Sequence, residues 1–170
     1  VQQKVQDLFG PRAAFDRLER MFYSHEVGSL PSLIKPLVGN TLPAGVVQPL
    51  NEEQVIQLAA LARTHGIPLV PRGKSTSGYG GVLPVKGGLV VDFAWMNKVV
   101  SIDAAARTVC VQPGVVWEKL EKELHKQGLA LCTYPSSAPS STVGGWLAQG
   151  GVGFGAYEYG AFRDNVVSCR

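Results

Sequence analysis

The chain has 170 residues, 45% of them hydrophobic, which suffices for one domain or two small subdomains with a buried core. Its formal net charge is only +3 and its lysines and arginines are scattered, which argues against a surface that binds nucleic acid or an anionic membrane. The three cysteines, Cys110, Cys132 and Cys169, lie far apart without metal-ligand spacing. We therefore expect no metal site and three buried, reduced thiols in a cytoplasmic protein without a transmembrane segment, and leave peripheral membrane association open.

Residues 1–43 are expected to form a helical and irregular segment. Apolar residues recur at helical spacing up to Tyr23 and are interrupted at Gly10-Pro11, which predicts two short helices. In the irregular part that follows, His25 and Glu26 are adjacent. An acid/base pair is one interpretation, but neighbours in sequence do not face each other, so a surface loop is preferred.

Residues 44–105 are expected to form a first α/β subdomain. A short strand near Val46 is followed by a helix that Asn51 and Gln54 open as a capping box, and a second strand follows Gly66. This strand–helix–strand unit favours parallel pairing, and the apolar run 88–93 predicts a third strand.

The second strand leads into the glycine-rich loop Pro71-Arg-Gly-Lys-Ser-Thr-Ser-Gly-Tyr-Gly-Gly81. Glycine lets backbone N–H groups approach a bulky ligand and adopt positive φ, and Ser75, Thr76 and Ser77 add hydroxyl donors. The loop is expected at the carboxyl end of its strand, where α/β sheets bind ligands. These properties predict an anion cradle suited to a pyrophosphate.

Two familiar phosphate-binding motifs do not apply. Gly73-Lys74-Ser75 resembles the end of a Walker loop, but Pro68 stands where that pattern needs a glycine, and the glycines that follow oppose a helix. The spacing of Gly151, Gly153 and Ala156 satisfies the letters of the dinucleotide fingerprint without a preceding strand. Neither motif is expected to be functional.

Residues 106–170 are expected to begin a second α+β subdomain. The apolar runs 99–103 and 108–112 predict two paired strands joined by a turn. The expected boundary between the subdomains, after residue 105, falls in this turn. Apolar residues from Val115 to Leu124 then line one side of a charged helix that ends near Gly128.

Residues 127–157 carry no charge, yet their prolines, hydroxyl residues and glycines make a poor membrane helix. Thirteen of the twenty glycines fall in the two windows 72–88 and 144–160, which suggests that two glycine-rich surfaces face one ligand. A short helix opening at Gly144 would direct its N-terminus at a phosphate. The alternative is a flexible Ser/Pro linker, which the flanking apolar residues disfavour.

Five motifs occur in order from about Ala44 to the end of the chain. They are the loop 71–81, Gly87-Gly-Leu-Val-Val-Asp92 with Met96-Asn97, Val111-Gln-Pro-Gly114, Pro135-Ser-Ser with Ser141-Thr-Val-Gly-Gly145, and Tyr159-Gly160 with Asp164-Asn-Val166. Together they resemble the FAD-binding domain of the vanillyl-alcohol-oxidase type, also called PCMH-type. The resemblance is greatest to its glycolate oxidase subunit and D-lactate dehydrogenase branch.

The resemblance implies an α+β, two-subdomain FAD-binding fold that is incomplete at the C-terminus. It also implies a FAD-dependent oxidoreductase that oxidises a small 2-hydroxy acid, such as glycolate or D-lactate, by hydride transfer to flavin. Electrons would pass to an iron–sulfur or other electron-transfer partner. The implied FAD-binding residues are Arg72, Gly73, Lys74, Ser75, Thr76, Ser77, Gly80 and Gly81, and then Pro135, Ser136, Thr142, Gly144, Gly145, Gly150, Gly151 and Gly153.

The chain departs from the family pattern in three respects. The loop 72–81 lacks the histidine of relatives that attach flavin covalently, so non-covalent FAD is expected. Lys74 and Ser75 replace glycines that are common in the family. The catalytic residues are expected beyond Arg170, so none is named and the isolated fragment is expected to be inactive. The same fold acting on a sugar lactone or a nucleotide sugar, and a non-catalytic fragment, remain alternatives.

Overall fold

The computed structural model describes residues 1–28, 33 and 35–170. The chain divides into the units Val1–Trp95 and Met96–Arg170. Residues 1–28 thus belong to the first unit, and the division lies before the first strand of the hairpin, earlier than the expected boundary after residue 105. Residues 29–32 and 34 of the expected irregular segment lie outside the described residues.

The first unit begins with the two predicted short helices, which a 3₁₀ turn and a short strand separate. Gly10 has φ 57°, a conformation that ends the first helix, and Pro11 follows it in the 3₁₀ turn. Asp16 caps the second helix by accepting a hydrogen bond from the backbone N–H of Glu19 at 2.9 Å. The elements are α1 (Gln2–Phe9), η1 (Gly10–Arg12), β1 (Ala13–Ala14), α2 (Arg17–Phe22) and α3 (Lys35–Val38).

The predicted strand–helix–strand unit is present as β2 (Gly45–Val47), α4 (Glu52–His65) and β3 (Leu69–Arg72). Asn51 caps α4 by accepting from the backbone N–H of Gln54 at 3.0 Å, and the Gln54 side chain accepts from the backbone N–H of Leu50 at 2.9 Å. Gly66 ends α4 in the left-handed conformation.

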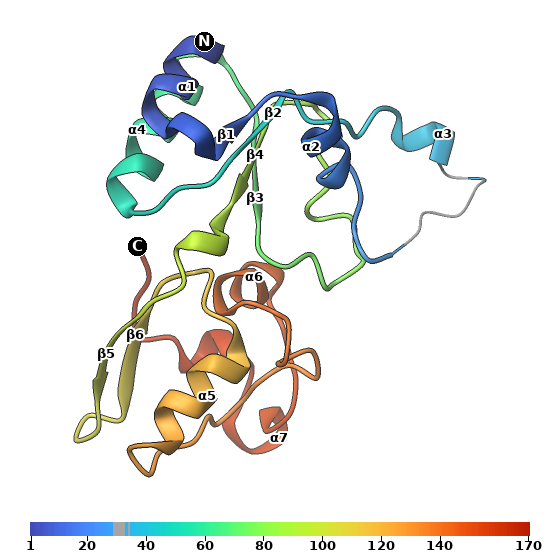
Figure 1. Ribbon diagram of the computed structural model, residues 1–170. Coiled ribbons are helices and arrows are strands. Elements are labelled where there is room, and N and C mark those ends of the chain that lie inside the picture. The colour runs from blue at the N-terminus through green and yellow to red at the C-terminus, as the bar shows by residue number, and fades with distance from the viewer. Residues whose placement is uncertain (29–32, 34) are drawn as a thin grey trace. The chain divides into compact units, whose positions relative to one another are not determined.

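The predicted third strand, β4 (Leu89–Asp92), lies between β2 and β3 and is parallel to both. Figure 1 labels the four strands of this sheet. Strand β1 pairs antiparallel with β2 at the edge of the sheet, and the strand order is β1-β2-β4-β3. Val5 and Phe9 of α1 and Leu58 of α4 pack on the sheet in the core of this unit. The parallel register places Arg72 of β3 opposite Asp92 of β4, so the carboxyl ends of these strands meet at one edge. A 3₁₀ turn, η2 (Phe93–Trp95), follows β4.

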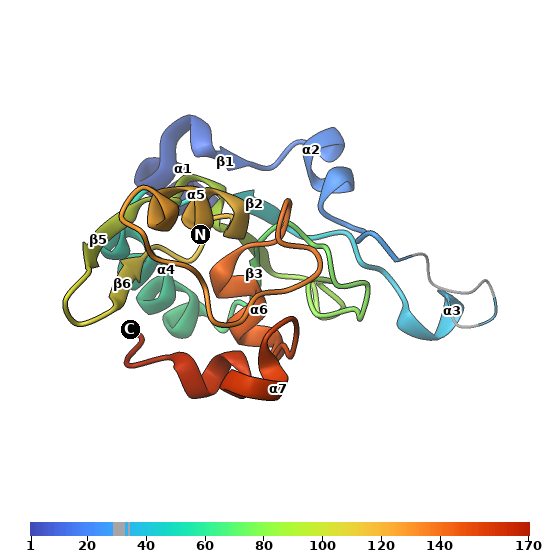
Figure 2. The same cartoon turned by 90° about the horizontal axis from the view of Figure 1, so that it is seen from below.

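The second unit contains the predicted hairpin and the predicted charged helix. The strands β5 (Val99–Asp103) and β6 (Thr108–Val111) are antiparallel, and Figure 2 labels them and helix α5 (Trp117–His125). Leu120 and Leu124 of α5 pack against side chains of both strands. The remaining elements are α6 (Val143–Gln149), α7 (Ala156–Tyr159) and η3 (Phe162–Asn165).

An aromatic cluster fills the core of the second unit. Trp117 of α5 and Trp146 of α6 meet edge to face with ring centroids 5.2 Å apart, and Phe162 contacts both rings. Because α6 starts at Val143 and buries Trp146, the charge-free stretch is folded structure at this point. Across the described residues, no helix is long and apolar enough to cross a membrane.

The prediction of three buried thiols is wrong. Cys110, Cys132 and Cys169 are free but exposed. Cys110 lies on β6, where successive side chains alternate between the two faces, and its partly buried neighbours Val109 and Val111 take the inner face. Cys132 lies in a loop and Cys169 lies in the last residues of the chain.

Candidate functional site

The glycine-rich loop leaves the carboxyl end of β3 and returns as β4, within the first unit. Residues 73–88 contain no helix, so the rejection of a Walker loop is confirmed. The dinucleotide fingerprint is likewise absent, because helix α6 rather than a strand precedes Gly151. The loop stands where the sequence predicted it, at the edge formed by parallel strand ends.

The loop backbone has the local geometry of an anion site. Ser75, Gly78 and Gly80 have positive φ values of 57°, 71° and 80°. In the described part of the chain, the backbone N–H groups of Lys74 to Tyr79 donate no hydrogen bond to another protein group. Successive free N–H groups in a backbone of alternating handedness form a concave nest for an anion.

Ser75 is the most informative residue of the loop. It is one of only two non-glycine residues with positive φ in the described chain, a conformation that is strained for a side-chain-bearing residue. The residue is 9% exposed, and its Oγ is buried without a hydrogen-bond partner in the described structure. A buried hydroxyl with no partner costs free energy unless a ligand or water pairs with it. This donor fits an oxyanion such as a phosphate.

The other hydroxyl and charged side chains of the loop are more accessible. Thr76 and Ser77 are half-buried, and Lys74 is exposed. A Cβ built on Gly80 would meet only Leu83 Cδ1, at 4.0 Å, and a Cβ built on Gly81 would meet nothing within 4 Å. The fold therefore does not require glycine at position 81, whereas a ligand lying close to this backbone would.

Arg72 lies half-buried at the start of the loop and is directed toward the N-terminal segment. Its Nη1 donates to the carbonyl oxygens of His25 at 3.0 Å and Tyr23 at 3.4 Å, and its guanidinium lies over the Tyr23 ring, 5.1 Å from the centroid. Burial lowers the pKa of Arg72 below its ordinary value, and the nearby Tyr23, Asp92 and Glu26 oppose that shift. Arg72 thus ties the loop to residues about fifty positions earlier in the sequence.

Asp92 collects hydrogen bonds at the carboxyl end of β4. One carboxylate oxygen accepts from the Tyr23 hydroxyl at 2.7 Å and from Gln48 Nε2 at 3.2 Å, and the other accepts from the backbone N–H of Ala94 at 2.9 Å. Gln48 in turn accepts from the Trp95 indole N–H at 3.1 Å. Burial first, and then the hydrogen bond and charge of Asp92, raise the pKa of Tyr23 above its ordinary value.

Glu26 is a residue that the sequence interpretation assigned to a surface loop, and that interpretation is wrong. The residue is buried, with 9% of its surface exposed, and its Oε1 accepts a hydrogen bond from the backbone N–H of Gly80 at 2.8 Å. The contact spans 54 positions, so no local pattern could predict it. Asp92 had a detectable signal, because it is the one charged residue in the apolar run of β4.

The second glycine cluster lies in the second unit and is held largely by internal contacts. Thr142 caps α6, its Oγ1 accepting from the backbone N–H of Gly145 at 3.3 Å. The N–H groups of Val143 and Gly144 donate to the carbonyl oxygens of Val115 and Pro113, both at 2.9 Å. The first turn of α6 therefore has its N–H groups paired within the protein, and the prediction that they attract a phosphate is not supported.

Close packing explains several glycines of this cluster. A Cβ on Gly144 would lie 2.6 Å from Pro113 Cβ, one on Gly151 would lie 1.9 Å from the Trp146 indole nitrogen, and one on Gly153 would lie 2.3 Å from the Tyr134 carbonyl oxygen. Gly150 ends α6 with φ 70°. Pro135 is buried and Ser136 is exposed. A contact of these residues with FAD stays a prediction.

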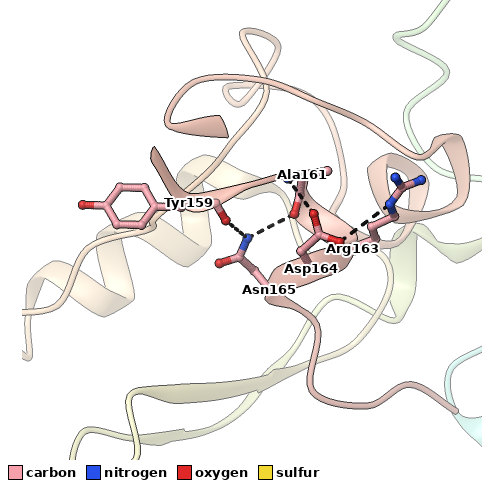
Figure 3. A network of polar contacts seen from close by, with 5 residues as sticks. All are labelled: Tyr159, Ala161, Arg163, Asp164 and Asn165. Atoms are coloured by element: carbon pink, nitrogen blue, oxygen red, sulfur yellow. Dashed lines mark hydrogen bonds and ion pairs between the residues drawn. The ribbon is translucent and has the colours of Figure 1, made fainter. Parts of the chain in front are cut away.

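The residues of the last sequence motif, 159–166, form a network of polar contacts around a turn. Figure 3 shows the Asn165 side chain donating to the carbonyl oxygens of Tyr159 at 2.9 Å and Ala161 at 3.1 Å. Asp164 accepts from the backbone N–H of Ala161 at 3.0 Å and lies 3.7 Å from Arg163 Nε. These side chains satisfy backbone groups around Gly160, which has φ 78°.

Comparison with known proteins gives consistent results. The family described as FAD binding domain matches residues 43–170. The alkyldihydroxyacetonephosphate synthase of Dictyostelium discoideum is 36% identical over 161 residues, which cover 91% of this chain and 26% of that protein. The glycolate oxidase subunit GlcD of Bacillus subtilis is 35% identical over 127 residues, 75% of this chain and 27% of that protein. The chain thus spans about a quarter of the length of these curated relatives.

Solved structures share the fold. An alkyldihydroxyacetonephosphate synthase superimposes with a TM-score of 0.83 at 32% identity, covering 95% of this chain and 34% of that one. Substrate-bound p-cresol methylhydroxylase superimposes with a TM-score of 0.66 at 24% identity, over 82% of this chain and 26% of that one, and this likeness concerns the fold alone. The chain therefore belongs to the family of FAD binding domains of the PCMH type, and FAD is the cofactor of this domain.

Proposed function

We propose that residues 72–77, with Gly80 and Gly81, hold the pyrophosphate of FAD. The observation that carries this assignment is the buried, unpartnered Ser75 hydroxyl in a loop whose N–H groups from Lys74 to Tyr79 are free in the described structure. These neutral donors suit the pyrophosphate oxygens. The Arg72 side chain contributes indirectly, because its described hydrogen bonds go to the backbone of Tyr23 and His25.

Pro135, Ser136, Thr142, Gly144, Gly145, Gly150, Gly151 and Gly153 are proposed to line the ribityl and flavin side of the same cofactor. Their support is the family resemblance of the motifs that contain them and the family match over 43–170. FAD is proposed to be non-covalent, because the loop 72–81 contains no histidine.

The proposed reaction is the oxidation of a 2-hydroxy acid, such as glycolate or D-lactate, by the whole protein. The support is that similar proteins are named glycolate oxidase subunit and D-lactate dehydrogenase. FAD, when bound, would accept the hydride that leaves the carbinol carbon, the hydroxyl proton would be released, and the hydroxy acid would become a 2-oxo acid. The chain's own residues bind and orient the cofactor, and an iron–sulfur or other electron-transfer partner is proposed to take the electrons onward.

Anaerobic reduction of the bound flavin tests the substrate class. The whole protein that contains this sequence is purified, and glycolate, D-lactate and L-lactate are added separately in the absence of oxygen. We expect glycolate or D-lactate to bleach the flavin absorbance and to yield the corresponding 2-oxo acid in equal amount. Flavin that stays oxidised with every 2-hydroxy acid, yet is bleached by dithionite, would refute this substrate class and leave the FAD site standing.

A second candidate function is the synthesis of an alkyl dihydroxyacetone phosphate, which the name of one similar protein states. The favouring observation is that the similarity to Dictyostelium alkyldihydroxyacetonephosphate synthase covers 91% of this chain and so includes most of residues 1–43, against 75% coverage for the glycolate oxidase subunit. Incubation with an acyl dihydroxyacetone phosphate and a long-chain alcohol, followed by mass spectrometry, distinguishes the two. An alkyl ether product would favour this candidate, and its absence together with flavin bleaching by a hydroxy acid would exclude it.

A further inference from the structure

The segment Tyr23–Gly28 contacts the glycine-rich loop at three separate points. The first is the hydrogen bond from the Gly80 backbone N–H to Glu26 Oε1, at 2.8 Å. Glu26 is 9% exposed, so the bond is shielded from water, and a bond to a carboxylate is stronger than one to a neutral acceptor. It fixes the far end of the loop.

The second contact fixes the near end of the loop. Arg72 donates to the carbonyl oxygens of Tyr23 and His25 and lies over the Tyr23 ring. Tyr23 is itself held by its hydroxyl, which donates to Asp92 at 2.7 Å. The segment is thereby anchored to the sheet edge from which the loop starts.

The third contact is a close backbone approach in the middle of the loop. A Cβ built on Gly28 would lie 3.0 Å from the Gly78 carbonyl oxygen and 3.1 Å from the Gly78 Cα. Gly78 is one of the three loop residues with positive φ. Glycine at position 28 therefore lets the segment lie directly against the loop backbone at Gly78.

We propose that Tyr23–Gly28 is a clamp that holds the glycine-rich loop in the conformation that binds FAD, with Glu26 as its positioning residue. Glu26 acts through Gly80 and does not bind the pyrophosphate, because a carboxylate would repel the phosphate charges. Arg72 supplies a nearby positive charge for this buried carboxylate. This inference rests on the proposed role of the loop in FAD binding.

The clamp lies outside the range 43–170 that matches the FAD binding domain family. The clamp is therefore an addition to the matched domain, supplied by the preceding segment. It predicts that FAD affinity depends on residues that the family match does not include.

Two substitutions of Glu26 in the whole protein test the clamp. Glu26→Ala removes the acceptor of the Gly80 N–H, whereas Glu26→Gln keeps an acceptor oxygen of the same size. Titration of the flavin-stripped protein with FAD is expected to give a Kd raised about tenfold for Glu26→Ala and changed less than about threefold for Glu26→Gln. Glu53→Ala, which removes an exposed glutamate at the start of α4, is the control and should leave Kd unchanged.

A second readout reports on the loop without FAD. Lys74 is exposed within the loop, so trypsin cleavage after Lys74 is expected to be several-fold faster in Glu26→Ala than in wild type or Glu26→Gln. If Glu26→Ala does not fold, Gly28→Ala replaces it, since its Cβ would press on Gly78 and should weaken FAD binding by a similar factor.

The outcomes separate the clamp from the function on which it rests. Wild-type protein that takes up no FAD would overturn both. Wild-type protein that binds FAD, with Glu26→Ala or its replacement Gly28→Ala binding equally well, would overturn the clamp alone. A Glu26→Gln variant as weak as Glu26→Ala would contradict the hydrogen bond as its basis.

Discussion

Tyr23 is held as a neutral phenol by burial and by its hydrogen bond to Asp92. Its pKa is raised in the folded state from an ordinary value of 10.0, so folding favours the protonated form. This contribution to stability is fully present below pH 10.0 and is lost as the pH rises from there toward the raised value, because the unfolded phenol ionises first.

The Tyr23→Phe variant tests this linkage. At neutral pH it is expected to lose about 1–2 kcal/mol of unfolding free energy, since Asp92 loses a hydrogen-bond donor. Above about pH 10 the gap between wild type and variant should shrink, because only the wild type loses the contribution of this phenol. Urea unfolding across this range measures the gap, and a gap that stays constant would contradict the raised pKa.

Gly81 separates a role in ligand binding from a role in folding. A Cβ at Gly81 would meet nothing within 4 Å, and the backbone of Gly81 does not have a positive φ. Gly81→Ala should therefore change the unfolding free energy by less than about 0.5 kcal/mol. The same methyl group would obstruct FAD, and Kd is expected to rise about tenfold.

Gly87 provides the matched control for Gly81. It has φ 66° with open space around it and lies outside the proposed FAD contacts. Gly87→Ala should show the opposite pattern, with a loss of about 1 kcal/mol of stability and an unchanged Kd for FAD. Equal FAD affinity in wild type and Gly81→Ala would argue against close approach of the cofactor to this backbone.

At the scale of elements, the parallel pairing of β3 and β4 depends on Gly88. It has φ 83°, and a Cβ there would lie 2.1 Å from the Pro68 carbonyl oxygen, the acceptor for the Leu89 N–H at 2.9 Å. Gly88→Ala is expected to destabilise the first unit by more than about 3 kcal/mol. The neighbouring substitution Gly87→Ala should lower the unfolding free energy by only about 1 kcal/mol. Equal stability of the two variants in thermal unfolding would refute the requirement for glycine at position 88.

Hydrophobic periodicity and capping residues predicted most helices and strands, because these elements depend on interactions between residues that are close in the sequence. Asn51 and Gln54 mark the start of α4, Gly66 marks its end, and the apolar runs give β4 and the β5–β6 hairpin. The strand β1 was not predicted, since two alanines carry no strand pattern and it forms only by pairing with β2. The placement of β4 between β2 and β3 is likewise tertiary information.

The loop of the candidate site was predictable, and its surroundings were not. Glycines and hydroxyl residues mark 72–81 in the sequence because backbone conformation and donor chemistry are local properties. The contact of Glu26 with Gly80 spans 54 positions and that of Tyr23 with Asp92 spans 69. The residues next to them in the sequence do not indicate such long-range contacts. The same limit explains the error over Cys110, whose exposure depends on which face of β6 packs inward.

At the scale of the whole molecule, FAD should stabilise the protein, because it binds the folded state and not the unfolded one. Free FAD at about 100 times its Kd is expected to raise the unfolding free energy by about 2.7 kcal/mol. Thermal unfolding of the flavin-stripped protein over a series of FAD concentrations measures this effect. A melting temperature independent of FAD concentration would contradict binding to the folded protein.

In the proposed mode of binding, the loop 72–81 holds FAD without a covalent bond. The most direct measurement is acid precipitation of the purified whole protein, followed by chromatographic identification and quantification of the flavin in the supernatant. The predicted result is about one FAD per chain, all of it in the supernatant, because no histidine is present in the loop. A protein that contains no flavin and takes up no added FAD would contradict the claim, as would flavin that stays attached to the precipitated chain.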